Sequence, residues 1–115
     1  MTPRKITETL SVSEQITAAD LPALAAQGYR SIICNRPDGE EPGQPPAAEI
    51  EAAARDLGLG FALLPVTPAT LDEAAGRAFG KLVRDLPGPV LAYCRSGARS
   101  STLWSLADAQ DPASR

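Results

Sequence analysis

Short apolar runs alternate with helical patterns along almost the whole chain, and this alternation constrains the fold more than any other feature. Each run has the length of a buried strand, and a segment with apolar residues at helical spacing follows each one. The runs cover residues 10–13, 31–34, 61–64 and 89–92. Strands that alternate with helices favour parallel pairing. The sequence therefore predicts an α/β fold with a mostly parallel four-stranded sheet and helices on both faces.

The first two predicted helices have recognisable start and stop signals. Thr17 and Asp20 resemble a capping box with Asp in place of Glu, and this box opens a helix that Gly28 ends. The second helix is rich in alanine and covers residues 47–57. Both helices carry apolar residues at core spacing, so each is expected to pack on the sheet.

A third helix is predicted to begin at the S/T-x-x-E box formed by Thr70 and Glu73. Gly76 and Gly80 follow on one face of this helix. Each glycine costs a helix about 1 kcal/mol relative to alanine, so the pair indicates a close contact. We expect this contact to be with the sheet.

Composition and charge exclude several classes of function. The 115 residues carry a formal net charge of −3 and no basic run, so a nucleic-acid partner is not expected. The sequence has neither an apolar signal-peptide core at its start nor the roughly 18 apolar residues of a membrane span. We expect a single cytoplasmic domain over residues 1–115, without a membrane partner and with a frayed end at 110–115.

The chain contains no histidine, which rules out Ser-His-Asp and Cys-His catalysis. Its two cysteines, Cys34 and Cys94, lie far apart in the sequence. A zinc site and a structural disulfide are therefore poor expectations, and both cysteines should be free thiols. We expect neither a metal nor a cofactor.

Cys94 lies between the apolar run 89–92 and the helical pattern at 102–107. In such a strand-loop-helix turn, backbone N–H groups and the helix N-terminus form an anion site. Arg95 and Arg99 add full positive charges, and these influences together lower the pKa of a thiol. A cysteine at the end of a strand can also be a small apolar residue of the core. The polar neighbours favour a catalytic nucleophile.

Two further sets of residues are expected to serve Cys94. The predicted anion-binding residues are Arg95, Ser96, Gly97, Ala98, Arg99 and Ser100. Residues 35–46 form a loop by every turn signal, and this loop also begins at the carboxyl end of a strand. Arg36, Asp38 and Glu40 are therefore candidates to overhang the site, and a solvated connector is the alternative.

The string from Cys94 to Ser100 resembles the active loops of rhodaneses, in which cysteine carries a persulfide. The segments at 35–40 and 64–67 resemble the dual-specificity phosphatases. Together with 10–16, they make the chain similar to the phosphatase-like domain of beta-lactamase-hydrolase-like proteins, also described as a sulfur transferase family. The resemblance implies a cysteine-phosphatase-like fold. It also implies, in longer relatives, a fused metallo-hydrolase that oxidises persulfides, which for this chain would be a separate partner.

Loop length and proton supply separate the two chemistries. The related phosphatases place five residues between cysteine and arginine, whereas four separate Cys94 from Arg99 and the longer spacing falls on Ser100. The related phosphatases also place an aspartic acid after the third strand, where this chain has Thr67 and Pro68. Transfer of sulfur from thiosulfate releases sulfite, which needs no proton donor. Both differences favour sulfur transfer.

These arguments predict a sulfurtransferase of the rhodanese reaction type. The Cys94 thiolate attacks a sulfane sulfur, Arg95, Arg99 and the loop amides hold the small anionic donor, and the persulfide passes to a thiol acceptor or cyanide. Two alternatives stay open. One is a cysteine-dependent phosphatase that acts on a phosphate ester with Asp38 as its acid, and the other is a non-catalytic anion or persulfide sensor. Cys34 is most simply a core residue, with a resolving thiol as the alternative.

Overall fold

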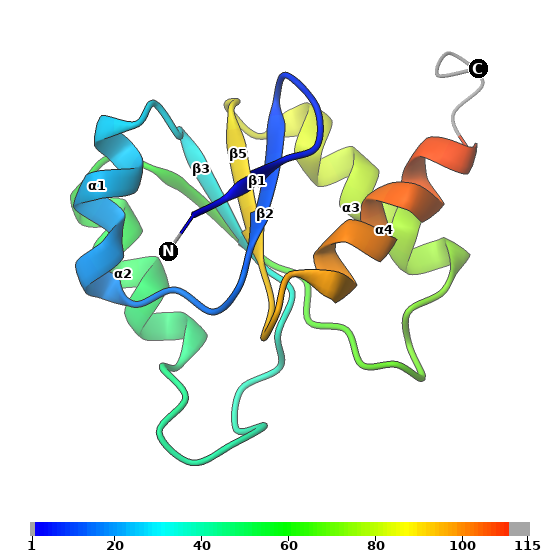
Figure 1. The fold of residues 1–115 in the computed structure, drawn as a ribbon, viewed down its shortest axis with the longest axis horizontal. Helices are drawn as coiled ribbons and strands as arrows, with labels where there is room; N and C mark the ends of the chain where they lie inside the picture. The colour runs from blue at the N-terminus through cyan, green and yellow to red at the C-terminus, as the bar shows by residue number, and fades with distance from the viewer. Residues whose placement is uncertain (1, 111–115) are drawn as a thin grey trace.

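The computed structural model describes residues 2–110, which form one sheet between two layers of helices (Figure 1). The elements follow the order that the apolar pattern predicts. They are β1 (Arg4–Lys5), β2 (Leu10–Ser13), a short 3-10 helix (Ala18–Asp20), α1 (Leu21–Ala26), β3 (Ser31–Cys34), α2 (Ala47–Asp56), β4 (Gly60–Leu63), α3 (Glu73–Asp85), β5 (Val90–Tyr93) and α4 (Ala98–Gln110).

The sheet has five strands in the order β1-β2-β5-β3-β4, and all pairs except β1 with β2 are parallel. The prediction of four strands is therefore one short. The missed strand β1 has only two residues, both charged and exposed, and so has no apolar run to announce it. β5 lies at the centre, where Tyr93 aligns with both Ser13 and Cys34. Three strands thus end at one edge of the sheet, directly beside Cys94.

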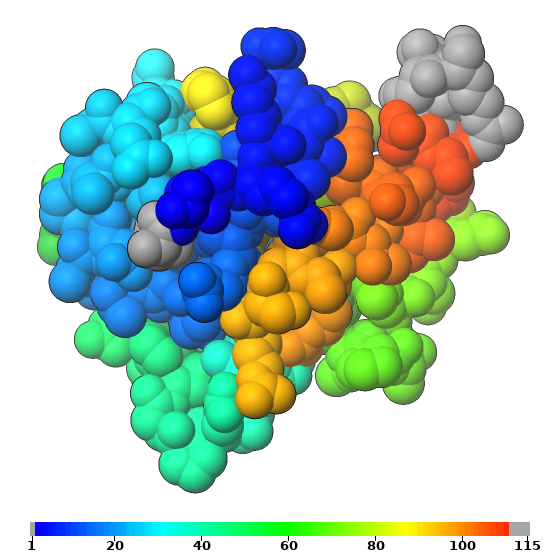
Figure 2. All heavy atoms as spheres, viewed as in Figure 1, coloured from blue at the N-terminus to red at the C-terminus, as the bar shows by residue number. Residues whose placement is uncertain are grey.

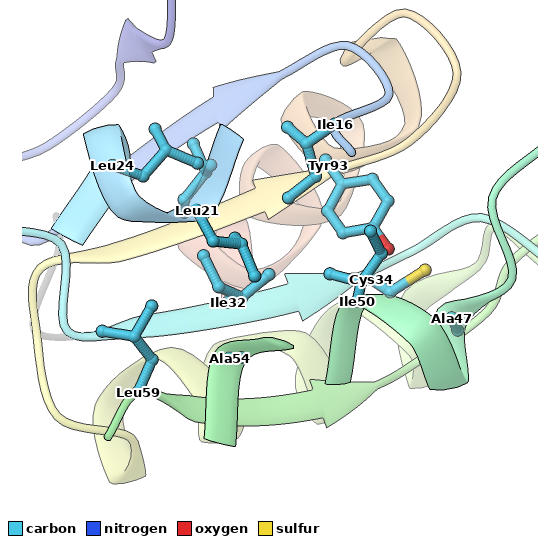
Figure 3. Packing of buried hydrophobic residues seen from close by; sticks show 11 residues of the cluster. Ile16, Leu21, Leu24, Ile32, Cys34, Ala47, Ile50, Ala54, Leu59 and Tyr93 are labelled. Carbon is cyan, nitrogen blue, oxygen red and sulfur yellow. The ribbon is translucent and has the colours of Figure 1, made fainter. Parts of the chain in front are cut away.

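Two apolar clusters hold the helices on opposite faces, which confirms the predicted layers (Figure 1). On the α1 and α2 side, Ile32 and Tyr93 pack with Leu24 and Ile50, as Figure 3 shows. On the α3 and α4 side, buried apolar residues of β2, β3 and β5 pack with Phe79 and Leu103 among others. Because side chains alternate along a strand, consecutive residues of β3 and β5 serve the two clusters in turn.

The cap of the first helical segment confirms the predicted signal. The Thr17 backbone N–H donates to the Asp20 carboxylate at 2.8 Å, and Gly28 follows α1 with a φ of +103°. At the other end of the chain, Gln110 is the last residue of α4. The rest of the segment predicted to be frayed, 111–115, lies outside the described residues.

The cap of α3 differs from the prediction. Asp72, not Thr70, precedes the helix, and its carboxylate accepts a hydrogen bond from the Ala75 N–H at 2.9 Å. Thr70 belongs to the preceding turn, where its hydroxyl accepts from the Thr67 N–H at 2.8 Å. Aspartate caps a helix at least as well as threonine, so the later residue ends up as the N-cap.

The glycine pair of α3 packs against α4, so the expected contact with the sheet is wrong. A Cβ at Gly76 would lie 2.6 Å from the Cβ of Leu106, and one at Gly80 would lie 3.0 Å from the Cβ of Ala107. α3 and α4 therefore approach each other more closely than a side chain at either glycine position would allow. None of the helices in the described part of the chain combines the length and apolar character that a membrane crossing requires.

Candidate active site

Cys94 is the first residue after the central strand β5, and α4 begins four positions later at Ala98. The structure thus places Cys94 in the strand-loop-helix turn that the sequence predicts. The thiol is free and the residue is only 1% exposed. The carboxyl edge of a parallel sheet is where open α/β folds place their ligands.

Backbone N–H groups surround the sulfur of Cys94. The Gly97 N–H donates to Cys94 Sγ at 3.0 Å. Burial alone would raise the pKa of this thiol, but hydrogen bonds from four backbone N–H groups outweigh it and the pKa lies below its ordinary value. Those four groups belong to Ser100, Ser96, Arg99 and Gly97. The loop therefore favours the thiolate, which is the nucleophilic form.

Gly97 gives the loop its curvature. Its φ of +95° lies in the left-handed region, and a Cβ there would lie 3.3 Å from the Ser13 carbonyl oxygen at the end of β2. The same end of β2 accepts a hydrogen bond from the Cys94 N–H at 3.4 Å. The Gln15 N–H donates to the Arg95 carbonyl at 3.2 Å. The loop is thus supported from the neighbouring strand.

Arg99 lies between Cys94 and an acidic residue that comes from another loop. Its Nη1 and Nη2 donate to the two carboxylate oxygens of Glu40, each at 2.8 Å, and Nη1 also donates to the Val66 carbonyl at 2.9 Å. The hydrogen bonds to Glu40, opposed by partial burial and reinforced by the charge of Cys94, raise the pKa of Arg99, whose side chain is only 16% exposed. The first turn of α4 thus brings a fixed cation to the sulfur.

The other predicted anion-binding residues occupy different positions around the loop. Arg95 is mostly exposed and its Nε lies 3.3 Å from a Glu41 carboxylate oxygen, at the rim of the site. The Ser96 hydroxyl accepts from the Ala98 N–H at 3.3 Å. Ala98 is the first residue of α4, and it takes part in this contact through its backbone N–H and not through its side chain.

Arg36 and Glu40 lie beside Arg99, as the overhanging alternative for this loop predicted, whereas Asp38 does not. Arg36 is 2% exposed and donates to Glu40 at 2.9 Å and to Glu41 at 2.7 Å. The hydrogen bond from Arg99, opposed by partial burial and reinforced by Arg36, lowers the pKa of the Glu40 carboxyl to about 2. The hydrogen bond from Arg36 also lowers the pKa of Glu41. The three arginines thus face two carboxylates.

Asp38 lies at the start of α2 instead of over Cys94. Its carboxylate accepts a hydrogen bond from the Ala47 N–H at 2.8 Å. Pro46, the residue that precedes α2, provides no side-chain cap, so the first N–H groups of the helix need an acceptor from elsewhere. The sequence suggested Asp38 as an acid because of its place in the loop, and the path of the loop carries it to the helix.

Asn35 is a site residue that the sequence reasoning missed. It is fully buried, and its Oδ1 accepts from the Ser100 hydroxyl at 2.8 Å while its Nδ2 donates to the Leu64 carbonyl at 3.0 Å. Asn35 therefore ties the end of β3 to the residue that follows β4 and to the first turn of α4. The hydroxyl of Ser100 points into the protein, and only its backbone N–H serves the sulfur. The signal in the sequence that pointed to this residue was an asparagine directly after an apolar run.

Cys34 packs in the core between the sheet and the first two helices (Figure 3). Its thiol donates to the Arg36 carbonyl at 3.3 Å, and burial raises its pKa. β3 does neighbour β5, as predicted. Cys94, in contrast, sits at the N-terminus of α4, which covers the opposite face of the sheet. This placement supports the core interpretation of Cys34.

Several hollows border the Cys94 loop, and two of them are lined by residues of the Cys94–Ser100 segment other than Arg95. One, about 470 Å³ in volume, is called the arginine hollow below and is lined by Arg36, Glu40, Glu41, Pro68, Arg95 and Arg99. The second, about 510 Å³, is lined by Thr2, Arg4, Val12, Ser13, Glu14, Arg95, Ser96 and Gly97. Figure 2 shows the loop (orange) at the surface, between residues 36–46 (teal) and the β4–α3 loop (yellow-green). Among residues 2–110, no three His, Cys, Asp or Glu side chains gather as a metal site.

A family model matches residues 3–111, which is nearly the whole chain, and it describes the phosphatase-like domain of beta-lactamase hydrolase-like proteins. The beta-lactamase hydrolase-like protein of Agrobacterium fabrum (strain C58) is 44% identical over 107 residues. The match covers 93% of this chain and 25% of that protein. The chain therefore spans about a quarter of the length of this curated relative.

Solved structures share the fold. A crystal structure from Neisseria meningitidis Z2491, described as a candidate phosphatase, has a TM-score of 0.84 and 40% identity, and covers 94% of this chain and 78% of its own. The core catalytic domain of the PP-IP phosphatase SIW14 from S. cerevisiae has a TM-score of 0.64 and covers 83% of this chain and 56% of its own. At 14% identity, that likeness shows the fold alone. By the family model, this chain belongs to the phosphatase-like domain family of beta-lactamase hydrolase-like proteins.

Proposed function

We propose that this chain is a cysteine-dependent phosphatase in which Cys94 attacks phosphorus and forms a transient phosphocysteine. The observation that carries the proposal is the setting of Cys94 Sγ, which accepts the Gly97 N–H at 3.0 Å in a loop whose backbone N–H groups lower its pKa, with the Arg99 guanidinium beside it. The phosphatase-like family and the phosphatases among the structural neighbours support it. These findings favour the phosphatase alternative over the sulfurtransferase that the spacing of the loop predicts.

The same N–H groups that stabilise the thiolate suit the oxygens of a bound phosphoryl group. An anion at the N-terminus of α4 gains from the helix dipole as well as from direct hydrogen bonds. These donors are held in place by β2, by Asn35 and by the helix itself, so they need no reorganisation when charge moves from sulfur to the phosphoryl oxygens. The loop can therefore stabilise both the nucleophile and the transition state.

Arg99 retains one edge of its guanidinium for the substrate. Glu40 and Val66 accept both hydrogens of Nη1 and one of Nη2. Within residues 2–110, this leaves the Nε–H and the second Nη2 hydrogen, which share one edge and form a two-pronged donor for an anion. Glu40 thus orients the arginine while the free edge binds phosphoryl oxygens beside Cys94.

Sulfur transfer is the second candidate, and the spacing of the loop favours it. Four residues separate Cys94 from Arg99, and the tighter ring suits a single persulfide sulfur. In this reaction an anionic sulfur donor takes the place of the phosphate compound, and a thiol accepts the sulfur from Cys94. The same thiolate and the same N–H groups would serve both reactions.

Two assays with matched cysteine variants test the choice. The native protein, Cys94→Ser and Cys34→Ser are each given para-nitrophenyl phosphate, and separately thiosulfate with cyanide. Phosphatase action predicts that the native protein and Cys34→Ser release nitrophenol while Cys94→Ser does not, because serine lacks an activated thiolate. Thiocyanate formation that depends on Cys94, without phosphate release, would establish the second candidate instead. If Cys94→Ser kept both activities of the native protein, both candidate functions would be contradicted.

A further inference from the structure

The carboxylates of the two loops that flank the arginine hollow, β3–α2 and β4–α3, are all held by other groups. This bears on which leaving groups can depart. Phosphate transfer to a thiolate expels an alcohol or acid oxygen, and a poor leaving oxygen needs a proton from the enzyme as it departs. A protein donor must be a protonated acid within hydrogen-bond reach of that oxygen. The position of each carboxyl group in and beside the arginine hollow therefore decides which substrates can react.

Glu40 and Glu41 are the two carboxyl groups that line the arginine hollow. Glu40 accepts hydrogen bonds from Arg99 and Arg36, and Glu41 lies within salt-bridge distance of Arg36 and Arg95. A carboxyl group that donates a proton must first hold one, and these ion pairs favour the ionised form. The lowered pKa values of both groups agree with the geometry. Neither has a proton to give at neutral pH.

The β4–α3 loop also borders the site but offers no acid. Its Val66 carbonyl accepts from Arg99, and its Pro68 lines the arginine hollow. Residues 64–71 contain no carboxyl side chain at all. The next one, Asp72, caps α3 through the Ala75 N–H, just as Asp38 caps α2 through the Ala47 N–H. Both candidate acids of the flanking loops are thus committed to helix N-termini.

Glu14 is the remaining carboxyl group that borders the Cys94 loop. It is exposed and lines the second hollow, which shares only Arg95 with the arginine hollow. Glu14 is therefore separated from the side of the loop where Arg99 presents its free edge. Its carboxylate has no hydrogen-bond or ion-pair partner within residues 2–110, so it is the carboxyl group beside the loop whose variant tests for a free acid.

We propose that this site takes phosphate compounds whose leaving group departs as a stable anion, namely acyl phosphates, phosphoanhydrides and activated aryl phosphates, and discriminates against alkyl phosphates. The inference rests on the proposed phosphatase function. The thiolate of Cys94 forms a bond to phosphorus as the bond from phosphorus to the leaving oxygen breaks. The electron pair stays on that oxygen, which leaves as carboxylate, phosphate or phenolate and takes no proton from the protein.

Water then completes the cycle. Its oxygen bonds to phosphorus, the sulfur–phosphorus bond breaks, and the electron pair returns to Cys94 as thiolate. The proton of the water is released to solvent or to the inorganic phosphate that forms. Because sulfur is stabilised as an anion by the four N–H groups, it is a good leaving group in this second step. Neither step needs a protonated side chain.

The size of the expected discrimination follows from the usual worth of a general acid. A positioned acid contributes roughly 10²–10⁴-fold to the reaction of a poor leaving group and little to that of a good one. In an enzyme with such an acid, kcat/KM therefore differs little between substrates with good and with poor leaving groups. Without it, kcat/KM should fall by at least about 10²-fold from acetyl phosphate to glycerol phosphate.

The test measures kcat/KM of the native protein for acetyl phosphate, para-nitrophenyl phosphate, phenyl phosphate and glycerol phosphate, with Cys94→Ser to subtract spontaneous hydrolysis. We expect activity to fall steeply as the leaving group becomes more basic. Similar kcat/KM values across the series would overturn this inference but leave the phosphatase proposal intact. Absence of Cys94-dependent turnover for every one of the four substrates would overturn both.

Carboxamide variants provide the matched controls. Glu14→Gln, Asp38→Asn and Asp72→Asn are each given phenyl phosphate and para-nitrophenyl phosphate, and the ratio of the two kcat/KM values is compared with that of the native protein. We expect the ratio to stay the same within about twofold, because a loss of stability affects both substrates alike. A variant that loses roughly 10²-fold on phenyl phosphate alone would identify the acid and overturn the inference.

Discussion

Cys94 and Cys34 show how neighbouring positions of one sheet edge give a thiol opposite properties. Both are nearly inaccessible, at 1% and 2% exposed. Burial raises the pKa of Cys34, and its thiol donates a hydrogen bond to the Arg36 carbonyl. Four N–H groups reverse the effect of burial at Cys94. The environment of the sulfur, and not its exposure, therefore separates the reactive thiol from the core residue.

This difference predicts the order of alkylation. Cys34→Ser and Cys94→Ser each leave a single thiol, and iodoacetamide labelling of the two variants can be followed by mass spectrometry between about pH 5 and 9. Cys94 should react at lower pH than Cys34, because its thiolate is the better stabilised of the two. Equal pH profiles, or earlier labelling of Cys34, would remove the electrostatic argument for a nucleophile.

At the scale of elements, the loop between β3 and α2 is folded over the site by charge. Glu40 joins Arg36 of its own loop to Arg99 of α4, and Asp38 anchors the other end of the loop on α2. The lowered pKa of Glu40 means that its ion pairs stabilise the folded protein. The loop is therefore part of the site and not a connector.

The stability of this loop should depend on pH in the acidic range. Because the folded-state pKa of Glu40 is depressed from 4.5 to about 2, its contribution is complete above about pH 4.5 and is lost as pH falls towards 2. Urea unfolding at several pH values should show a smaller loss of stability on acidification for Glu40→Gln than for the native protein.

An exposed ion pair gives the control for this experiment. Glu51→Gln removes the carboxylate that pairs with Arg55 on the surface of α2, where exposed pairs contribute little. This variant should follow the pH dependence of the native protein. If Glu40→Gln also follows it, the contacts of Glu40 do not contribute to folding stability.

At the scale of the molecule, local patterns explain what was predictable. Four strands, four helices and the Cys94 turn follow from apolar runs of strand length and from helical periodicity, which are properties of neighbouring residues. The missed features depend on the path of the chain. The bonds of Asn35 with Ser100, Glu40 with Arg99 and Asp38 with Ala47 all join segments whose approach is decided by the whole fold.

The packing of α3 against α4 also depends on the path of the chain and not on a local pattern. Spacing showed that Gly76 and Gly80 share a face, but the partner of that face is fixed only when both helices lie on the same side of the sheet. Sequence alone therefore predicted the strand-loop-helix setting of Cys94, which the structure confirms. The contacts that orient Arg99 and that occupy the carboxylates required the structure.

The proposed reaction requires that Cys94 becomes covalently phosphorylated during turnover. The native protein and Cys34→Ser can be mixed with acetyl phosphate, quenched rapidly, digested and analysed by mass spectrometry for the peptide that contains Cys94. We expect one phosphoryl group on Cys94 in both proteins and its absence in Cys94→Ser. Turnover of acetyl phosphate without a phosphorylated Cys94, or a phosphoryl group on any other residue, would rule out Cys94 as the nucleophile.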